Sequence, residues 1–241
     1  MEAEEFLSQA DAERTRRTLT TLSRFDFSRL VLTGGFAVEL HHLLRGLVTR
    51  PRPLNDIDFL AGSFAEIPEA LSSKMQFRHV HPMDPPGRML MQCVDPETAV
   101  RVDIFYACGD TMQRATPIEI GGIGLRLIAM EDLTARTARL CMDLVDSTPA
   151  PAKHARDFLR LHPLADLDAV ESVWQEHRKP KHPKSFKAAA GILTGLIASR
   201  PDLQIIPRYS TDANDRCSRC EVSTAFPLAD PEHVLRLLGY C

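Results

Sequence analysis

The segment from Leu30 to Phe59 constrains the fold more than any other part of this chain. It runs from a short apolar stretch, through the pair Gly34-Gly35, to an amphipathic pattern and then to Asp56-Ile57-Asp58. The apolar stretch predicts a buried strand, and the spacing of apolar residues over 36–45 predicts a helix. The glycine pair is therefore expected at a strand-to-helix turn, where a ligand can approach the backbone closely and a helix N-terminus favours phosphate.

Three carboxylates are spaced so that they can meet. Asp56 and Asp58 project side by side, because residues two apart in a strand share a face. Asp103 lies in the alternating segment 99–106, on the face that also carries Arg101. If the two strands pair, the carboxylates form one cluster, and neighbouring carboxylates repel unless a cation neutralises them.

The cation that best suits such a cluster is Mg²⁺, a hard ion that prefers oxygen ligands and is often held by carboxylates together with substrate phosphates. Three carboxylates can hold two metal ions about 3.5–4 Å apart, which clamp the attacking and leaving oxygens of a displacement at phosphorus. The alternative is that the glycines form an ordinary turn and that Asp56 and Asp58 are solvated residues at a strand end.

Three motifs carry a resemblance to a known superfamily: Leu32-Thr33-Gly34-Gly35-Phe36-Ala37, Asn55-Asp56-Ile57-Asp58-Phe59 and Val102-Asp103-Ile104. They resemble the signatures of the DNA polymerase β-like nucleotidyltransferases. Within that superfamily the chain is most similar to the minimal bacterial branch that contains antibiotic nucleotidyltransferases and AbiEii-type toxins. Thr49-Arg50-Pro51-Arg52 and the Lys153-x-x-x-Asp157 spacing are similar to further features of that branch. The resemblance covers residues 28–162.

The resemblance implies a fold, an activity and a set of site residues. The fold is α+β: a mixed sheet of the nucleotidyltransferase type, flanked by helices and followed by a helical C-terminal lobe. The catalytic, Mg²⁺-binding residues are Asp56, Asp58 and Asp103, and the nucleotide-binding residues are Thr33, Gly34, Gly35, Arg52, Lys153 and Asp157. In this superfamily a serine often follows the glycines, whereas Phe36 stands here, so the role of the hydroxyl is lost or passes to Thr33.

The expected reaction is transfer of a nucleoside monophosphate from an NTP to a hydroxyl acceptor. The acceptor is RNA, tRNA above all, in a toxin-like role that would include an antitoxin partner, or a small molecule such as an aminoglycoside. A catalytically silent binding module with the same fold is the hypothesis from another class. Lys153 and Asp157, four residues apart on a predicted helix, can equally form an ordinary surface ion pair.

Composition narrows the class of protein. The 241 residues carry a net charge of −3 and 25% charged side chains, so the basic footprint of a dedicated nucleic-acid binder is missing. No apolar run reaches the roughly 18 residues of a membrane span, and the acidic start of the chain does not have the layout of a signal peptide. We therefore expect a cytoplasmic protein that does not enter a membrane and whose six cysteines are reduced.

The pattern along the chain predicts three parts: a nucleotidyltransferase core with an N-terminal helix over 1–127, a helical lobe over 128–205 and a cysteine-containing tail over 206–241. Helix 4–24 has apolar positions too sparse for deep burial. Strands are expected near 29–33, 55–60, 76–81, 88–94, 99–106 and 117–127, and helices over 64–74, 130–144, 153–161, 166–177 and 185–200. Gly121-Gly122 predicts a hairpin turn.

Two further segments could have either a binding function or an ordinary structural role. The basic segment from Lys179 to Lys187 can grip an RNA backbone or serve as a solvated linker. In the tail, Cys217 and Cys220 have the spacing of zinc ligands, and His233 and Cys241 are the candidates to complete a structural zinc site.

Overall fold

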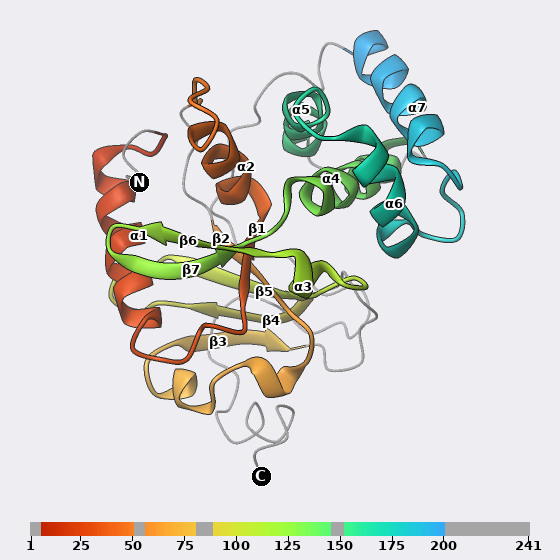
Figure 1. The fold of residues 1–241 in the computed structure, drawn as a ribbon. Coiled ribbons are helices and arrows are strands. Elements are labelled where there is room, and N and C mark those ends of the chain that lie inside the picture. Colours follow the sequence, from red (N-terminus) through yellow and green to blue (C-terminus); the bar gives the residue numbers. More distant parts are fainter. Residues whose placement is uncertain (1–5, 51–55, 81–88, 146–151, 201–241) are drawn as a thin grey trace. The chain divides into compact units, whose positions relative to one another are not determined.

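The computed structural model describes residues 6–50, 56–80, 89–145 and 152–200 (Figure 1). These residues form two compact units, each of which is described by itself. The first comprises the described residues up to Ala107 together with Ala115–Leu127, and the second comprises Cys108–Arg114 together with the described residues from Ile128 onward. The short segment Cys108–Arg114 therefore belongs with the helices, although it precedes two strands of the sheet.

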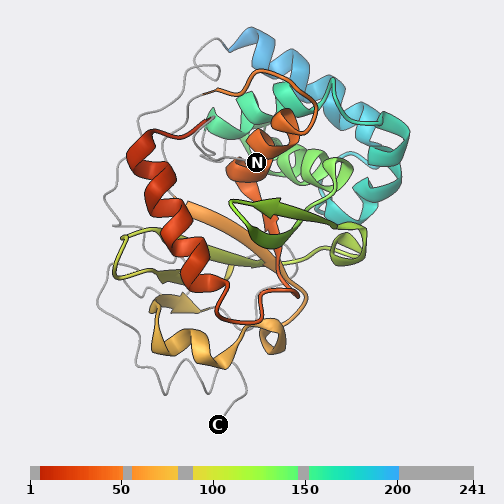
Figure 2. The same cartoon turned by 60° about the vertical axis from the view of Figure 1, so that its left-hand side comes forward.

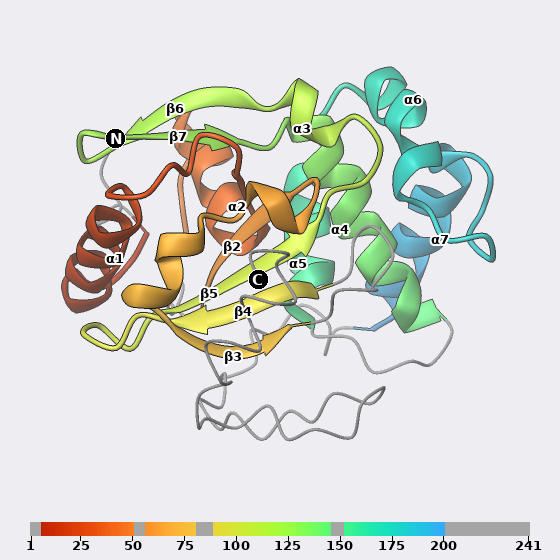
Figure 3. The same cartoon turned by 90° about the horizontal axis from the view of Figure 1, so that it is seen from below.

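The first unit is built on one mixed sheet, which has seven strands within the described residues. Figure 3 shows β3 and β6 at its two edges. The order across the sheet is β3-β4-β5-β2-β1-β7-β6. The strands are β1 (Val31–Thr33), β2 (Asp56–Ala61), β3 (Gln76–Val80), β4 (Met89–Val94), β5 (Arg101–Tyr106), β6 (Thr116–Ile120) and β7 (Ile123–Leu127).

The centre of the sheet combines both strand directions. β1 pairs with β2 antiparallel and with β7 parallel, while β2 pairs with β5 parallel. All three residues of β1 are buried, as expected for a strand with neighbours on both sides. The expected strand 117–127 is two strands, β6 and β7, joined by a turn at Gly121 and Gly122, whose φ angles of +54° and +79° suit glycine.

The helix α2 (Gly34–Leu43) follows β1 directly and packs on β1 and β2. The predicted helix 64–74 was wrong. This segment forms two short 3₁₀ helices, η2 (Phe64–Glu66) and η3 (Glu69–Ser73), separated by Pro68. Proline has no N–H and disfavours helical backbone in the residue before it, so one continuous helix is interrupted there.

The helix α1 (Gln9–Leu22) is more deeply buried than its sequence suggested. Leu19 and Leu22 are each 1% exposed, and the side chains of Thr15 and Thr18 are also buried. The Thr18 hydroxyl donates to Asp95 Oδ2 at 2.9 Å and lies 2.6 Å from Thr98 Oγ1. Both partners belong to the loop that connects β4 to β5. The expectation of shallow burial was wrong because it considered the apolar positions alone, whereas threonines share the buried face.

The second unit is helical. It contains α3 (Thr111–Arg114), α4 (Met130–Val145), α5 (Ala152–Leu161), α6 (Leu167–His177) and α7 (Phe186–Ser199), and Figure 2 shows α4 to α7 in green to blue. Their core contains Phe158, Trp174, Phe186 and Leu193, all buried. The expected α+β fold class, a mixed sheet flanked by helices with a helical lobe, is confirmed. Among the described residues, no helix combines the length and the apolar character needed to cross a membrane.

Candidate functional site

The register of β2 and β5 brings the predicted carboxylates together. In this parallel pair Asp58 stands opposite Asp103 and Asp56 stands opposite Arg101. One carboxylate oxygen from each of Asp56, Asp58 and Asp103 lies within 4.8 Å of the others. The side chain of Asp103 is 4% exposed and that of Asp56 is 13% exposed. We call Asp56, Asp58 and Asp103 the carboxylate cluster.

The turn before α2 is shaped around Asp58. Gly34 has a φ of +67°, and a Cβ added to it would lie 1.8 Å from Asp58 Oδ2. A side chain at this position would therefore be strained by the backbone and would collide with the carboxylate. Glycine is needed here for both reasons, and the first turn of α2 lies against the carboxylate cluster as a consequence.

The start of α2, next to the carboxylate cluster, has features that suit an anion. The first backbone N–H groups of a helix have no partner within the helix, and its dipole favours negative charge at that end. Thr33 is the N-cap residue but makes no side-chain cap hydrogen bond, and its buried Oγ1 has no hydrogen-bond partner among the described residues. Phe36 is buried against Phe6, with ring centroids 5.1 Å apart, so the residue at the usual serine position belongs to the core.

Sequence reasoning missed the two side chains that hold the cluster in place. Arg101 Nη2 pairs with Asp56, and Arg101 Nε lies 3.2 Å from Asp103 Oδ1. Gln92 on β4 donates from Nε2 to Asp103 Oδ1 at 2.8 Å. A signal for Arg101 was present, because it stands two residues before Asp103 on the same face, whereas Gln92 is found only from the register of β4 with β5.

The charges of the cluster act on their neighbours. Burial alone would lower the pKa of Arg101, but Asp103 and Asp56 raise it overall, so the guanidinium is always charged. Burial, with further contributions from Asp103 and Asp95, raises the pKa of the Cys93 thiol far above its usual range. Cys93 is therefore a protonated thiol beside the cluster and does not add a soft ligand to it.

The donor set fits a hard divalent cation. All three candidate ligands are carboxylates, one oxygen of each lies within 4.8 Å of the others, and the guanidinium of Arg101 pairs with two of them. Oxygen donors with an excess of negative charge are what Mg²⁺ or Mn²⁺ requires. Because Gly34 has no side chain, Asp58 Oδ2 can lie against the first turn of α2. Asp56, Asp58 and Asp103 are thus the residues that would hold the metal.

The remaining predicted nucleotide-binding residues are not part of this cluster. Gly35 follows Gly34 in the first turn of α2. Lys153 and Asp157 both lie on α5 in the second unit, where Asp157 is 3% exposed, so the alternative of a surface ion pair does not describe Asp157. Arg52 lies outside the described residues, as do the four candidate zinc ligands Cys217, Cys220, His233 and Cys241.

A buried charge network in the second unit was also missed. Asp132 on α4 is fully buried and accepts from Arg114 Nε at 2.7 Å and from the Thr111 hydroxyl at 2.9 Å. His177 Nε2 on α6 lies 2.8 Å from Asp132 Oδ1. Glu176 accepts from Arg114 Nη1 at 3.1 Å. We call these five residues the Asp132 network. Of its features, only the place of Asp132 in the first turn of a helix was expected from the sequence.

Comparisons with known proteins add a likeness of fold. No protein-family model matches the sequence, and no curated protein matches it. The structure of ANT(2")-Ia in complex with adenylyl-2"-tobramycin is similar at 15% identity, over 70% of this chain and 95% of that chain, with a TM-score of 0.46. A nucleotidyltransferase-like antigen of Paracoccidioides brasiliensis shares 17% identity over 84% and 92% of the two chains, with a TM-score of 0.40.

JHP933 from Helicobacter pylori is similar at 16% identity, over 83% of this chain and 96% of that chain, with a TM-score of 0.40. Similarity at this level concerns the fold, so a functional assignment depends on the site itself. None of these three structures is described as an AbiEii-type toxin, and that part of the resemblance stays a prediction.

Proposed function

We propose that this chain is a metal-dependent nucleotidyltransferase that moves a nucleoside monophosphate from an NTP to a hydroxyl acceptor and releases pyrophosphate. The observation that carries the proposal is the carboxylate cluster, in which oxygens from two paired strands lie within 4.8 Å of one another. Three carboxylates so close together cost free energy unless a cation binds them, and this supports a metal site over a silent copy of the fold.

Each part of the site has a role in this reaction. Asp56, Asp58 and Asp103 would hold Mg²⁺, which would supply Lewis acidity toward the triphosphate. Asp103 would also orient the attacking hydroxyl or accept its proton. Gly34 and Gly35 offer backbone N–H groups to phosphate oxygens at the start of α2. Catalysis of this kind depends on positioning and electrostatics, with no covalent intermediate on the protein.

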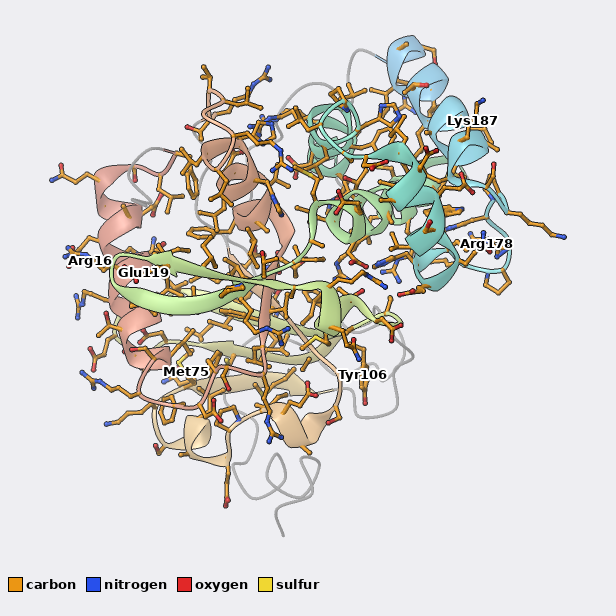
Figure 4. All side chains as sticks on the ribbon, viewed as in Figure 1. Arg16, Met75, Tyr106, Glu119, Arg178 and Lys187 are labelled. Carbon is orange, nitrogen blue, oxygen red and sulfur yellow. The ribbon has the colours of Figure 1, made fainter. Side chains whose placement is uncertain are left out.

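Among the acceptors, the basic segment from Lys179 to Lys187, which leads from α6 into the first turn of α7, favours RNA. It carries four lysines and no acidic side chain, and Lys187 at its end and Arg178 just before it are labelled in Figure 4. The segment is braced and not a loose linker: Trp174 Nε1 donates to the Pro183 carbonyl at 2.9 Å, and the buried His182 ring stacks on Trp174. Lysines on a fixed support lose less entropy when they bind a phosphate backbone.

The experiment that tests the function is incubation of the protein with each α-labelled NTP and Mg²⁺, with total RNA in one series and a panel of aminoglycosides in another. We expect label on one class of acceptor, and no label with Asp56→Ala/Asp58→Ala protein. Label on RNA supports the toxin-like role, with or without an antitoxin, and label on a drug supports the alternative acceptor. Mg²⁺-independent labelling, or labelling that survives the double substitution, would contradict the proposal.

The basic segment has a test of its own. Replacing Lys181, Lys184 and Lys187 with glutamine removes three exposed charges and should weaken single-stranded RNA binding. The slope of log K against log salt should become shallower by about 2, since each phosphate contact contributes about 0.7. In a matched control, glutamine replaces Arg16, Arg17 and Arg24, three exposed arginines of the first unit. This control should leave the slope unchanged. Equal slopes for the two variants would exclude the segment as the RNA site.

A further inference from the structure

Arg101 holds two of the three carboxylates that a metal ion would bind. Its guanidinium pairs with Asp56 through Nη2 and lies 3.2 Å from Asp103 through Nε. This arrangement is fixed by the backbone, because Arg101 stands opposite Asp56 in the parallel pair and two residues before Asp103 on its own strand. A guanidinium and a divalent cation would therefore compete for the same two carboxylates.

The guanidinium also keeps the capacity to bind an anion. Arg101 Nε is a buried donor that, among the described residues, has an ion-pair distance to Asp103 but no hydrogen bond. The side chain is 29% exposed, so it is not enclosed by the cluster. Arginine carries five N–H donors in a planar fork that matches phosphate oxygens. The same side chain can thus leave the carboxylates and donate to a phosphate group.

We propose that Arg101 competes with the divalent cation for Asp56 and Asp103 and transfers to phosphate when the cation binds together with a nucleotide. The inference rests on the proposed function, because it takes the ligand of the carboxylate cluster to be a metal with an NTP. Its consequence is a coupling between the two ligands. The cation binds weakly by itself and more tightly with nucleotide, and by linkage the nucleotide binds more tightly with the cation.

The first experiment measures Mn²⁺ binding to the full chain without nucleotide, by the loss of the electron paramagnetic resonance signal of free Mn²⁺. Arg101→Gln removes the competitor, and its Mn²⁺ affinity should rise roughly tenfold above that of the unsubstituted protein. Arg101→Lys keeps a positive charge and should bind Mn²⁺ nearly as weakly as the unsubstituted protein. Arg17→Gln is the matched control, since Arg17 is an exposed arginine paired with Glu97 at 3.4 Å and lies outside the cluster.

The second experiment repeats the titration with an NTP analogue that has a non-hydrolysable α,β bridge. In the unsubstituted protein the analogue should increase the Mn²⁺ affinity strongly, whereas in Arg101→Gln the increase should be several-fold smaller. Thermal melting shows that the variant is folded: without Mn²⁺ it should melt below the unsubstituted protein, and Mn²⁺ should raise its melting temperature by more. Arg101→Gln protein that binds Mn²⁺ no more tightly, with an unchanged effect of the analogue, would overturn the inference.

These measurements separate failure of the inference from failure of the proposed function. If Mn²⁺ binding requires Asp56 and Asp58 but does not respond to Arg101→Gln, the metal site stands and the competition is wrong. If Arg101→Gln binds Mn²⁺ more tightly but no acceptor is ever labelled, the competition stands and the reaction is wrong. If neither protein binds Mn²⁺, both are wrong.

Discussion

The two charge clusters of this chain are built from similar residues but are balanced differently. In the described part of the first unit, three carboxylates lie together, and the guanidinium of Arg101 is shared between Asp56 and Asp103. In the second unit, Asp132 and Glu176 meet Arg114 and His177, and the central Asp132 accepts from several donors. Among the described residues, the first cluster has an excess of negative charge, while in the second the central carboxylate is satisfied by donors of the protein itself.

The difference distinguishes a site from a structural element. A buried carboxylate that accepts hydrogen bonds from fixed donors is stabilised in the folded state, and removal of it leaves those donors unpaired. Carboxylates that repel one another reduce stability, and the single guanidinium of Arg101 offsets the charge of the carboxylate cluster only in part. The Asp132 network ties α3 to α4 and α6, whereas the carboxylate cluster retains its negative charge for a cation. The same Asp→Asn change should therefore have opposite consequences at the two places.

The largest expected effect is on stability at Asp132. Asp132→Asn should lower the free energy of unfolding of the second unit by about 3–5 kcal/mol, because the charges of Arg114 and His177 lose their buried partner. Trp174 is the single tryptophan and lies in the core of this unit, so its fluorescence in a urea titration reports the transition directly. Asp168→Ala, at an exposed residue of α6, is the control and should cost at most about 0.5 kcal/mol.

Asp58→Asn completes this comparison. It should lower the rate of nucleotidyl transfer by about a thousandfold or more, since the proposed metal site loses one of its ligands. Its free energy of unfolding, followed by circular dichroism, should stay within about 1 kcal/mol of the unsubstituted protein or rise, because like-charge repulsion falls. A loss of stability as large as that of Asp132→Asn would mean that the carboxylate cluster is also a structural network.

A smaller effect on stability and activity is expected from substitution of Gly34, which can be compared with another glycine of the first unit. Gly34→Ala places a methyl group against Asp58 in addition to the cost of its φ of +67°, and both stability and activity should fall. Gly121→Ala is the matched control, with a φ of +54° and nothing within 4 Å of the added carbon. The control should lose only the backbone cost of about 1–2 kcal/mol and keep its activity. Equal activity in the two variants would show that Asp58 can move without harm.

The members of the carboxylate cluster could be named from the sequence by local rules, although their meeting depends on the pairing of β2 with β5. Strand alternation puts Asp56 beside Asp58, and an apolar strand around Asp103 indicates a neighbouring central position. The glycine pair before α2 is similarly a local feature. The same reasoning predicted most of the strands and helices along the chain. It gave one strand where β6 and β7 stand, did not predict α3, and failed at Pro68, where two short 3₁₀ helices replace one helix.

The Asp132 network could not be predicted in this way. Its members come from α3, α4 and α6, and Asp132 and His177 are 45 residues apart in the chain. Nothing in the local pattern of Thr111 or His177 indicates a buried partner, because the contact depends on how the helices pack. Arg101 lies between these cases, since its face was evident from the sequence but its partners depend on the register of β2 and β5.

The smallest expected effect is a pH dependence that only the Asp132 network should show. Burial alone would lower the pKa of His177, but the Asp132 carboxylate and the Cys108 thiol raise it overall. Arg114 and Glu176 are the other charged members of the network. The charges of Arg136 and Arg139 help to lower the pKa of Cys108. Because the folded-state pKa lies above the unfolded one, the stabilisation by His177 is complete below the unfolded pKa and is lost as pH rises through the folded one.

The measurement is the difference in free energy of unfolding between the unsubstituted protein and His177→Gln, followed by Trp174 fluorescence. This difference should be larger at about pH 6 than at about pH 9, since the unfolded pKa of histidine is about 6.5. Cys108→Ala should reduce the pH dependence but retain its sign, because the carboxylate of Asp132 remains ionised and hydrogen-bonded to His177. A difference that grows with pH would mean that His177 is neutral in the folded protein. The negative charge of the Asp132 network would then not be offset by His177, and the contrast with the carboxylate cluster would be weaker.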